Sequence, residues 1–237
     1  AGKQSALGDV WAILLGSFFF IGIIGYRVLD PTNIAWLGDG YDPTQHYLGW
    51  VFFRHSPWSF PLGLNPDYGL DISSAIVYSD SIPWLAFLFK PFSSLLPEPF
   101  QYIGLWMFLC FILQAFFSWK LISLFSQNWI TRSLAVGLMV ISPPMLFRFG
   151  LHAALAGHFL ILAGLYLNLR RGKKNQTIYW IILLSSGALI HFYLFAMIFS
   201  LWFADLIDRY FLFSQKNSAA LFFKEMVVIC VLLLLIA

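Results

Sequence analysis

The stretch VWAILLGSFFFIGIIGYRV occupies residues 10–28, and its apolar length decides the class of the fold. A helix needs about 20 predominantly apolar residues to cross a bilayer, and this run comes close to that length. Arg27 stands at its far end and no small-residue cleavage site follows. These features favour a first membrane span over a cleavable signal peptide, which is the rival interpretation.

The composition of the whole chain agrees with a membrane protein. Of the 237 residues, 60% are hydrophobic and only 11% are charged, whereas about a quarter of the residues in an average soluble domain are charged. The composition excludes a disordered chain, a disulfide scaffold and a soluble enzyme. A net charge of +3 does not indicate a nucleic-acid partner, and both cysteines lie in apolar runs.

Further apolar segments predict an all-α, polytopic transmembrane helix bundle of about seven spans in a single membrane domain, residues 1–237. The expected spans are 10–28, 100–125, 130–147, 152–169, 177–191, 193–212 and a run from about 225. The last run stops after 12 residues, Met226 to Ala237, and the chain lacks an initiator Met. We therefore expect a longer protein with a further C-terminal part.

Residues 29–99 form a long first loop in this layout. Its apolar segments 43–55 and 82–96 are too short or too broken by proline to be good spans, so we expect amphipathic helices that lie on the membrane interface. Asp42-Pro43 suits the start of the first of them.

Charged residues orient the bundle. Ten of the 14 basic residues lie at one set of helix ends, and the positive-inside rule places that set in the cytoplasm together with the N-terminus. Seven of the 11 acids lie in the 29–99 loop, and all five histidines lie at or towards the same side. We therefore expect any chemistry at the outer face.

Three short motifs carry a resemblance to a known superfamily. They are Gly38-Asp39-Gly40-Tyr41-Asp42, Tyr78-Ser79-Asp80-Ser81-Ile82-Pro83-Trp84-Leu85 and Ser142-Pro143-Pro144-Met145-Leu146-Phe147-Arg148. With one long outer loop after the first span, the chain resembles the GT-C superfamily of polytopic membrane glycosyltransferases, and in particular uncharacterised bacterial inner-membrane members. The spacing Asp-x-x-Asp departs from the Asp-x-Asp or Glu-x-Asp that is frequent in that superfamily.

The resemblance implies a function at the bacterial inner membrane. The expected reaction transfers a sugar from a polyprenyl-phosphate-linked donor to an acceptor at the periplasmic face, where the 29–99 loop would lie. The seven spans would correspond to the N-terminal module of the superfamily. The bilayer and the lipid-linked donor are then the expected partners.

Asp39 and Asp42 are the first candidates for catalysis. A carboxylate within hydrogen-bond reach can take the proton of an acceptor hydroxyl, and we prefer Asp39 over Asp42 as this base. The pair could instead hold a divalent cation, Mg²⁺ or Mn²⁺, against a phosphate. The structural alternative is a turn in which both acids cap backbone groups.

Arg148, His152 and Arg54 are candidates for the donor phosphate, because arginine binds phosphate through two hydrogen bonds. Arg148 could equally bind lipid headgroups at a span end, and Arg54 could be an exposed interfacial arginine. Four further residues are candidates for supporting positions around the site: Asp80, His46, His158 and His191.

Each supporting residue has a structural alternative. Asp80 suits an N-cap for the helix that follows Pro83, and His158 or His191 could make a hydrogen bond between helices. Treated as one continuous helix, the chain would put His152 and His158 about 120° apart, so a shared metal is not expected. A metal set of Asp39, Asp42 and His46 has no tight ligand spacing to support it.

Two other classes of function remain open. A transporter or flippase would place ionisable groups near the membrane midplane, and here only His158 approaches that depth. A non-catalytic assembly protein is compatible with a degenerate acid motif.

Overall fold

The computed structural model describes residues 2–38, 42–170, 175–212 and 218–236. The chain is 76% helix with almost no strand, which confirms the helical class predicted from the sequence. The long helices are α1 (Gly2–Ile23), α4 (Ile103–Ile122), α5 (Trp129–Val140), α7 (Phe159–Leu169), α8 (Gln176–Ala188), α9 (Phe192–Ile207) and α10 (Ser218–Ile236).

Three segments of the described residues are long and apolar enough to cross a membrane: Ala6–Ile23, Ile103–Ile122 and Trp129–Leu151. The third contains a break, because Pro143 and Pro144 end α5 and begin a separate helix, α6 (Pro143–Leu151). The short helices α7 and α8 fall below the length of a span, and the seven spans expected from the sequence stay a prediction.

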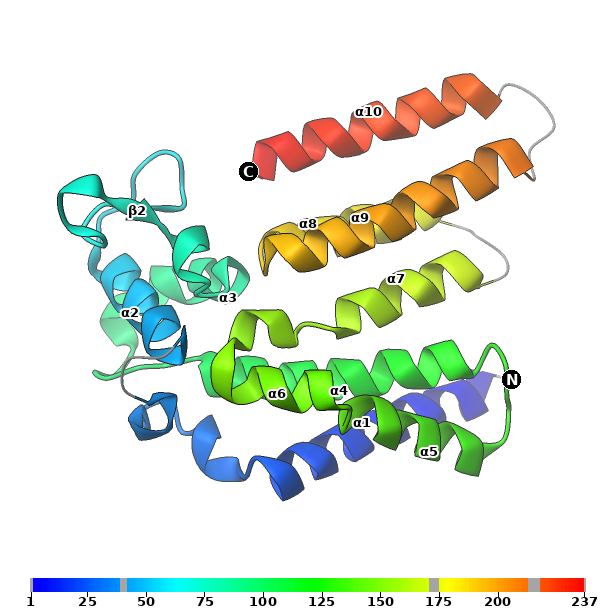
Figure 1. Cartoon of the computed structure of the whole chain (residues 1–237), viewed down its shortest axis with the longest axis horizontal. Coiled ribbons are helices and arrows are strands. Elements are labelled where there is room, and N and C mark those ends of the chain that lie inside the picture. The colour runs from blue at the N-terminus through cyan, green and yellow to red at the C-terminus, as the bar shows by residue number, and fades with distance from the viewer. Residues whose placement is uncertain (1, 39–41, 171–174, 213–217, 237) are drawn as a thin grey trace.

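The long helices lie side by side (Figure 1). α1 packs on α4, α4 packs on α5 and α7, α7 packs on α9, and α8 packs on α9 and α10. Between α1 and α4, the ring of Phe20 meets Phe108 and Phe111 edge-on at 5.1 and 5.4 Å. Asp9 of α1 also pairs with Lys120 of α4 at 2.6 Å. Aromatic packing and one ion pair therefore join two helices that are distant in the sequence.

Residues 26–38 and 42–102 gather at one end of the bundle, here called the loop end (Figure 1). The N-termini of α1, α5 and α10 and the C-termini of α4 and α7 meet at the opposite end, here called the basic end. The shorter elements of the loop end are η1 (Tyr26–Leu29), η2 (Ala35–Leu37), α2 (Asp42–His55), η3 (Leu70–Ile72), η4 (Ile76–Ser79), α3 (Pro83–Phe89) and η5 (Lys90–Leu95). Strands β1 (Leu64–Asn65) and β2 (Ser74–Ala75) pair antiparallel, Leu64 opposite Ala75.

The two helices expected inside the 29–99 loop are present. α2 begins at Asp42, as the Asp-Pro start signal predicts. The second consists of α3 followed by the 3₁₀ helix η5, and the change occurs at Lys90-Pro91, where proline removes a backbone donor. Their location at a membrane interface stays a prediction.

Buried side chains anchor the loop end to backbone carbonyls. Trp50 donates its indole N–H to the carbonyl of Phe100 at 3.1 Å, and buried Lys90 donates to that of Phe53 at 2.6 Å. Arg54 donates to the carbonyls of Ser93, Leu96 and Pro97 and pairs with Glu98 at 3.2 Å. These bonds satisfy carbonyls that no helix or sheet uses.

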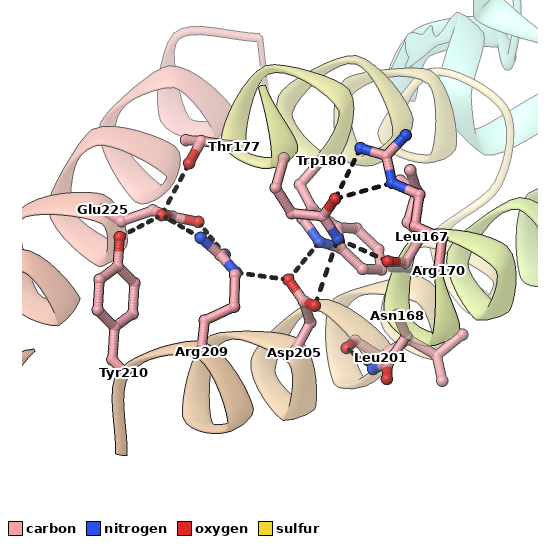
Figure 2. Close-up of polar contacts among 11 residues, drawn as sticks. Leu167, Asn168, Arg170, Thr177, Trp180, Leu201, Asp205, Arg209, Tyr210 and Glu225 are labelled. Carbon is pink, nitrogen blue, oxygen red and sulfur yellow. Dashed lines mark hydrogen bonds and ion pairs between the residues drawn. The ribbon is translucent and has the colours of Figure 1, made fainter. Parts of the chain in front are cut away.

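A network of charged side chains joins α8, α9 and α10 at the basic end (Figure 2). Arg209 donates to Asp205 at 2.8 Å and, through two nitrogens, to Glu225 at 2.6 and 2.9 Å. Thr177 and Tyr210 also donate to Glu225, and Trp180 donates to Asp205. Arg209 belongs to η7 (Asp208–Leu212), a short π-helical extension of α9.

Candidate functional site

Three histidines and one aspartate from four separate segments meet at the loop end. His46 comes from α2, Asp80 follows η4, His152 ends α6 and His191 precedes α9. The Nε2 atoms of His152 and His191 each lie 3.5 Å from a different oxygen of Asp80. The ring centroid of His152 is 5.1 Å from that of His46 and 5.2 Å from that of His191. We call these four residues the His/Asp cluster.

The backbone turns Asp80 towards the histidines. Asp80 has φ 51° and ψ 29°, in the left-handed region that aspartate tolerates better than most residues. Ile82 is also left-handed, at φ 52°, and it precedes α3 without any side-chain cap. The N-cap role predicted for Asp80 is therefore wrong, because Ile82 occupies that position and the carboxylate of Asp80 faces imidazoles.

Neighbouring hydroxyl groups hold this turn in place. The buried Ser81 hydroxyl donates to the carbonyl of His46 at 2.6 Å and lies 2.7 Å from the Ser79 hydroxyl. The hydroxyl of Tyr102 donates to the carbonyl of Ser81. Surrounding contacts of this kind are what sustains a strained backbone, and here they fix Asp80 relative to His46.

Close approach of α2 to this turn depends on Gly49. A Cβ atom at this position would overlap the side chains of Ser79 and Ser81. At Gly22 in α1, by contrast, a Cβ atom would meet nothing within 4 Å.

We expect Gly49→Ala to lower stability by about 1–3 kcal/mol through overpacking, although alanine favours a helix over glycine by about 1 kcal/mol. Gly22→Ala gains the helical preference without the overlap, so it is expected to leave stability unchanged or raised. Unfolding midpoints in mixed detergent micelles compare the two. Equal midpoints would show that α2 does not need its close contact with Ser79 and Ser81.

The protonation of the His/Asp cluster follows from its surroundings. Burial, and after it the repulsion from a charge on His152, lowers the pKa of His46 to about 4 although Asp80 and Asp42 oppose the shift. Burial also lowers the pKa of His191, against the attraction of Asp80. For Asp80, burial raises the pKa, but His152, His191 and His46 outweigh burial and hold the pKa below its ordinary value. At neutral pH the carboxylate is charged and His46 and His191 are neutral.

A backbone contact sets the tautomer of His191. Its Nδ1 accepts a hydrogen bond from the backbone N–H of Tyr193 at 3.1 Å. In the neutral ring the proton therefore stands on Nε2, the atom that faces Asp80. His191 consequently presents a donor to one oxygen of the carboxylate.

Two nitrogens of the cluster have no hydrogen-bond partner among the described residues. They are the buried Nδ1 atoms of His46 and His152. His46 is only 2% exposed. Buried polar atoms in native proteins are almost always paired, so both need an explanation.

The remaining candidates from the sequence are Asp39, Asp42, Arg148, Arg54 and His158. Asp42 is exposed at the start of α2, four residues before His46 and therefore on the same side of the helix. The negative charge of its carboxylate acts to raise the pKa of His46, against the larger effect of burial. Asp39 lies outside the described residues.

Arg148 and Arg54 differ in their surroundings. Arg148 is half-buried in α6, near enough for its charge to disfavour protonation of His191. Arg54 is buried and donates to three carbonyls, which gives it a structural role in the loop end.

His158 is absent from the His/Asp cluster. It precedes α7, whereas His152 ends α6, and the 3₁₀ helix η6 (Ala153–Ala156) separates them. The continuous helix assumed for this pair is therefore wrong, because the chain changes direction after Leu151.

An apolar groove of about 730 Å³ runs along α4, α7 and α8. Trp84 and Ile190 line one end of it, and Lys120 and Arg170 line the other. The backbone N–H of Trp84 donates to the carbonyl of Leu189 at 2.9 Å, and Ile190 directly precedes His191. The groove therefore reaches the segment that carries one member of the His/Asp cluster.

The family model for DUF6311, a domain of unknown function, matches residues 13–237. The chain belongs to the DUF6311 family. No curated protein and no solved structure matches it. The DUF6311 match covers all four members of the His/Asp cluster and the expected spans except the first three residues of the first one.

Proposed function

We propose that this DUF6311 chain is a membrane glycosyltransferase that transfers a sugar from a polyprenyl-phosphate-linked donor to an acceptor at the loop end. One observation carries the proposal: the apolar groove along α4, α7 and α8 reaches the segment that holds His191. A lipid-linked substrate needs this combination, an apolar path for its chain and a polar site for its headgroup.

The proposal includes a topology in the bacterial inner membrane. The helices α1, α4, α7, α8, α9 and α10 and the α5–α6 pair would be the seven spans. The basic end would face the cytoplasm, because ten basic residues lie at the corresponding helix ends. The loop end would then be periplasmic, and the resemblance to the GT-C superfamily supports the same orientation.

Asp42 is the proposed base, because Asp39, which the sequence favours, lies outside the described residues. Asp42 is exposed, and it lies at the entrance of α2 beside the His/Asp cluster. The acceptor oxygen attacks the anomeric carbon of the donor sugar while Asp42 takes the acceptor proton. The bond between that carbon and the phosphate oxygen breaks, and its electron pair leaves with the phosphate.

Arg148 is the proposed partner of the leaving phosphate. A guanidinium stays charged at all relevant pH values and can donate two parallel hydrogen bonds to phosphate oxygens. Arg148 lies in the last turn of α6, and the backbone N–H of His152 donates to its carbonyl at 3.0 Å, so it is beside the cluster and not at the distant basic end.

Native mass spectrometry of the protein, purified gently from its own membrane, tests this function. We expect a co-purifying polyprenyl phosphate or its sugar conjugate. Arg148→Ala should reduce the retained fraction about tenfold or more, because a charge-assisted hydrogen-bonded contact contributes about 1.5–3 kcal/mol. Arg27→Ala, which removes an exposed arginine of η1, is the matched control and should retain the lipid.

A second variant tests the groove separately. Ser186 lines the groove and bonds only within its own helix, to the carbonyl of Ile182. Ser186→Trp should fill the groove and displace the lipid. Retention of bulk phospholipid alone by the unmodified protein would overturn the proposed function.

A further inference from the structure

The His/Asp cluster has the spacing of a metal site. One ligand atom from each of His46, Asp80 and His152 can be chosen so that all three lie within 4.8 Å of one another. The Nε2 atom of His152 stands 3.5 Å from Asp80 Oδ2, which is longer than an ordinary hydrogen bond. Ligand bonds of about 2.0–2.1 Å in a tetrahedron put two ligand atoms about 3.4 Å apart.

Burial of His46 is an independent observation that points to a ligand. This imidazole is 2% exposed, and its Nδ1 lacks a hydrogen-bond partner among the described residues. The Nδ1 of His152 has the same property. A cation bound at His46 Nδ1 would give that buried atom a partner, which no described side chain provides.

His191 has a different part in the cluster. Because its Nδ1 accepts from the Tyr193 N–H, its Nε2 carries a proton and faces Asp80 Oδ1. At 3.5 Å this N–H is also farther from Oδ1 than in an ordinary hydrogen bond, so it attracts this oxygen electrostatically and leaves Oδ2, beside His152, available to a cation. Supporting contacts of this type are frequent around metal ligands in proteins.

We propose that His46, Asp80 and His152 bind a divalent transition-metal ion, with His191 as a positioning residue. Two imidazoles and one carboxylate suit Zn²⁺, whereas Mg²⁺ prefers oxygen ligands. The site differs from the magnesium or manganese site predicted at Asp39 and Asp42, because only one of its ligands is a carboxylate. Three protein ligands also leave a coordination position open for water or substrate.

Metal binding by these residues does not depend on sugar transfer, although any part of the ion in catalysis rests on the proposed function. Asp80 and His152 are partly exposed, at 29% and 20% of their side chains, so an ion can reach the cluster from solvent.

The test uses the full chain in detergent, purified without a histidine tag, stripped with a chelator and dialysed against Zn²⁺. Elemental analysis should find about one ion per chain at micromolar free Zn²⁺. His46→Ala, His152→Ala and Asp80→Asn should each lose at least nine-tenths of it. His191→Ala should weaken affinity about 10–100-fold, the usual cost of losing a supporting contact.

Two histidines outside the cluster provide matched controls. His55 is exposed at the end of α2, and His158 precedes α7. His55→Ala and His158→Ala should bind Zn²⁺ as the unmodified protein does. Equal loss in these controls, or full binding in His46→Ala and His152→Ala, would overturn the site.

A measurement on the unmodified protein avoids the risk that a variant fails to fold. X-ray absorption of the Zn²⁺-loaded protein should show two imidazole ligands per ion and no sulfur. Absence of stoichiometric binding, or a spectrum with only oxygen ligands, would overturn the proposal. If the protein binds Zn²⁺ in this way but retains no polyprenyl phosphate, the proposed metal site stands and the proposed function is overturned.

Discussion

Asp42→Asn is expected to reduce sugar transfer by about 10²–10⁴-fold, the usual contribution of a positioned general base. Asparagine keeps the size of the side chain but cannot take a proton at neutral pH. Since Asp42 is exposed at the first turn of α2, the change should leave the fold intact. The measurement is turnover of the lipid-linked donor identified by mass spectrometry.

Asp71→Asn is the matched control for this change. Asp71 is also an exposed acid of the loop end, in η3, and it is absent from the His/Asp cluster. It should leave transfer unchanged. Asp42→Asn should keep its Zn²⁺, because Asp42 is not a proposed ligand, whereas Asp80→Asn should lose both Zn²⁺ and turnover. Unchanged turnover in Asp42→Asn would remove the base assignment.

Glu225→Ala is expected to destabilise the protein by about 3–5 kcal/mol, because it removes one of the two carboxylates that pair with the largely buried guanidinium of Arg209. The side chains of Glu225 and Arg209 are only 4% and 14% exposed, so solvent cannot replace the lost contacts. Figure 2 shows that the carboxylate of Glu225 also accepts hydrogen bonds from the hydroxyls of Thr177 and Tyr210. Its loss should release α10 from α8 and η7. Unfolding in mixed detergent micelles measures the decrease in stability.

Lys224→Ala is the control beside it, since Lys224 is charged but exposed. It should change stability by less than about 0.5 kcal/mol, as surface substitutions usually do. Glu225→Gln retains the acceptor oxygen and should lie between the two. A Glu225→Ala protein as stable as the unmodified one would mean that the network does not hold α10 in place.

Local signals in the sequence were enough for several elements. The Asp42-Pro43 start of α2 and the break at Lys90-Pro91 appear where short-range rules place them. The helix expected over 130–147 is instead divided at Pro143-Pro144, where α5 has ended and α6 begins. These rules depend on backbone chemistry within a few residues, and so they survive without tertiary information. The helix assumed from 152 to 169 failed because Gly157 and the turn at His152 interrupt a run that is apolar apart from its histidines and Asn168.

The candidate site was only partly predictable. The order of the residues predicted that the histidines and most acids lie on the same side of the helix bundle, and this side corresponds to the loop end. The cation site expected at Asp39 and Asp42 was inferred from two carboxylates that lie close together in the sequence. Closeness in the sequence cannot reveal residues that meet from different elements. Nothing local linked Asp80 to His152, and a good N-cap signal pointed to another role for it.

The sequence by itself determined that this chain is mostly helical and has apolar runs long enough to cross a membrane, because apolar content and run length are properties of composition that any fold must accommodate. It also predicted that the histidines and most of the acids would lie at one end. Only the tertiary structure decided that His46, Asp80, His152 and His191 meet, and that Arg209 is buried against Glu225. The physical reason is that such contacts form between separate helices and turns, and their geometry depends on how α2, α6 and α9 pack.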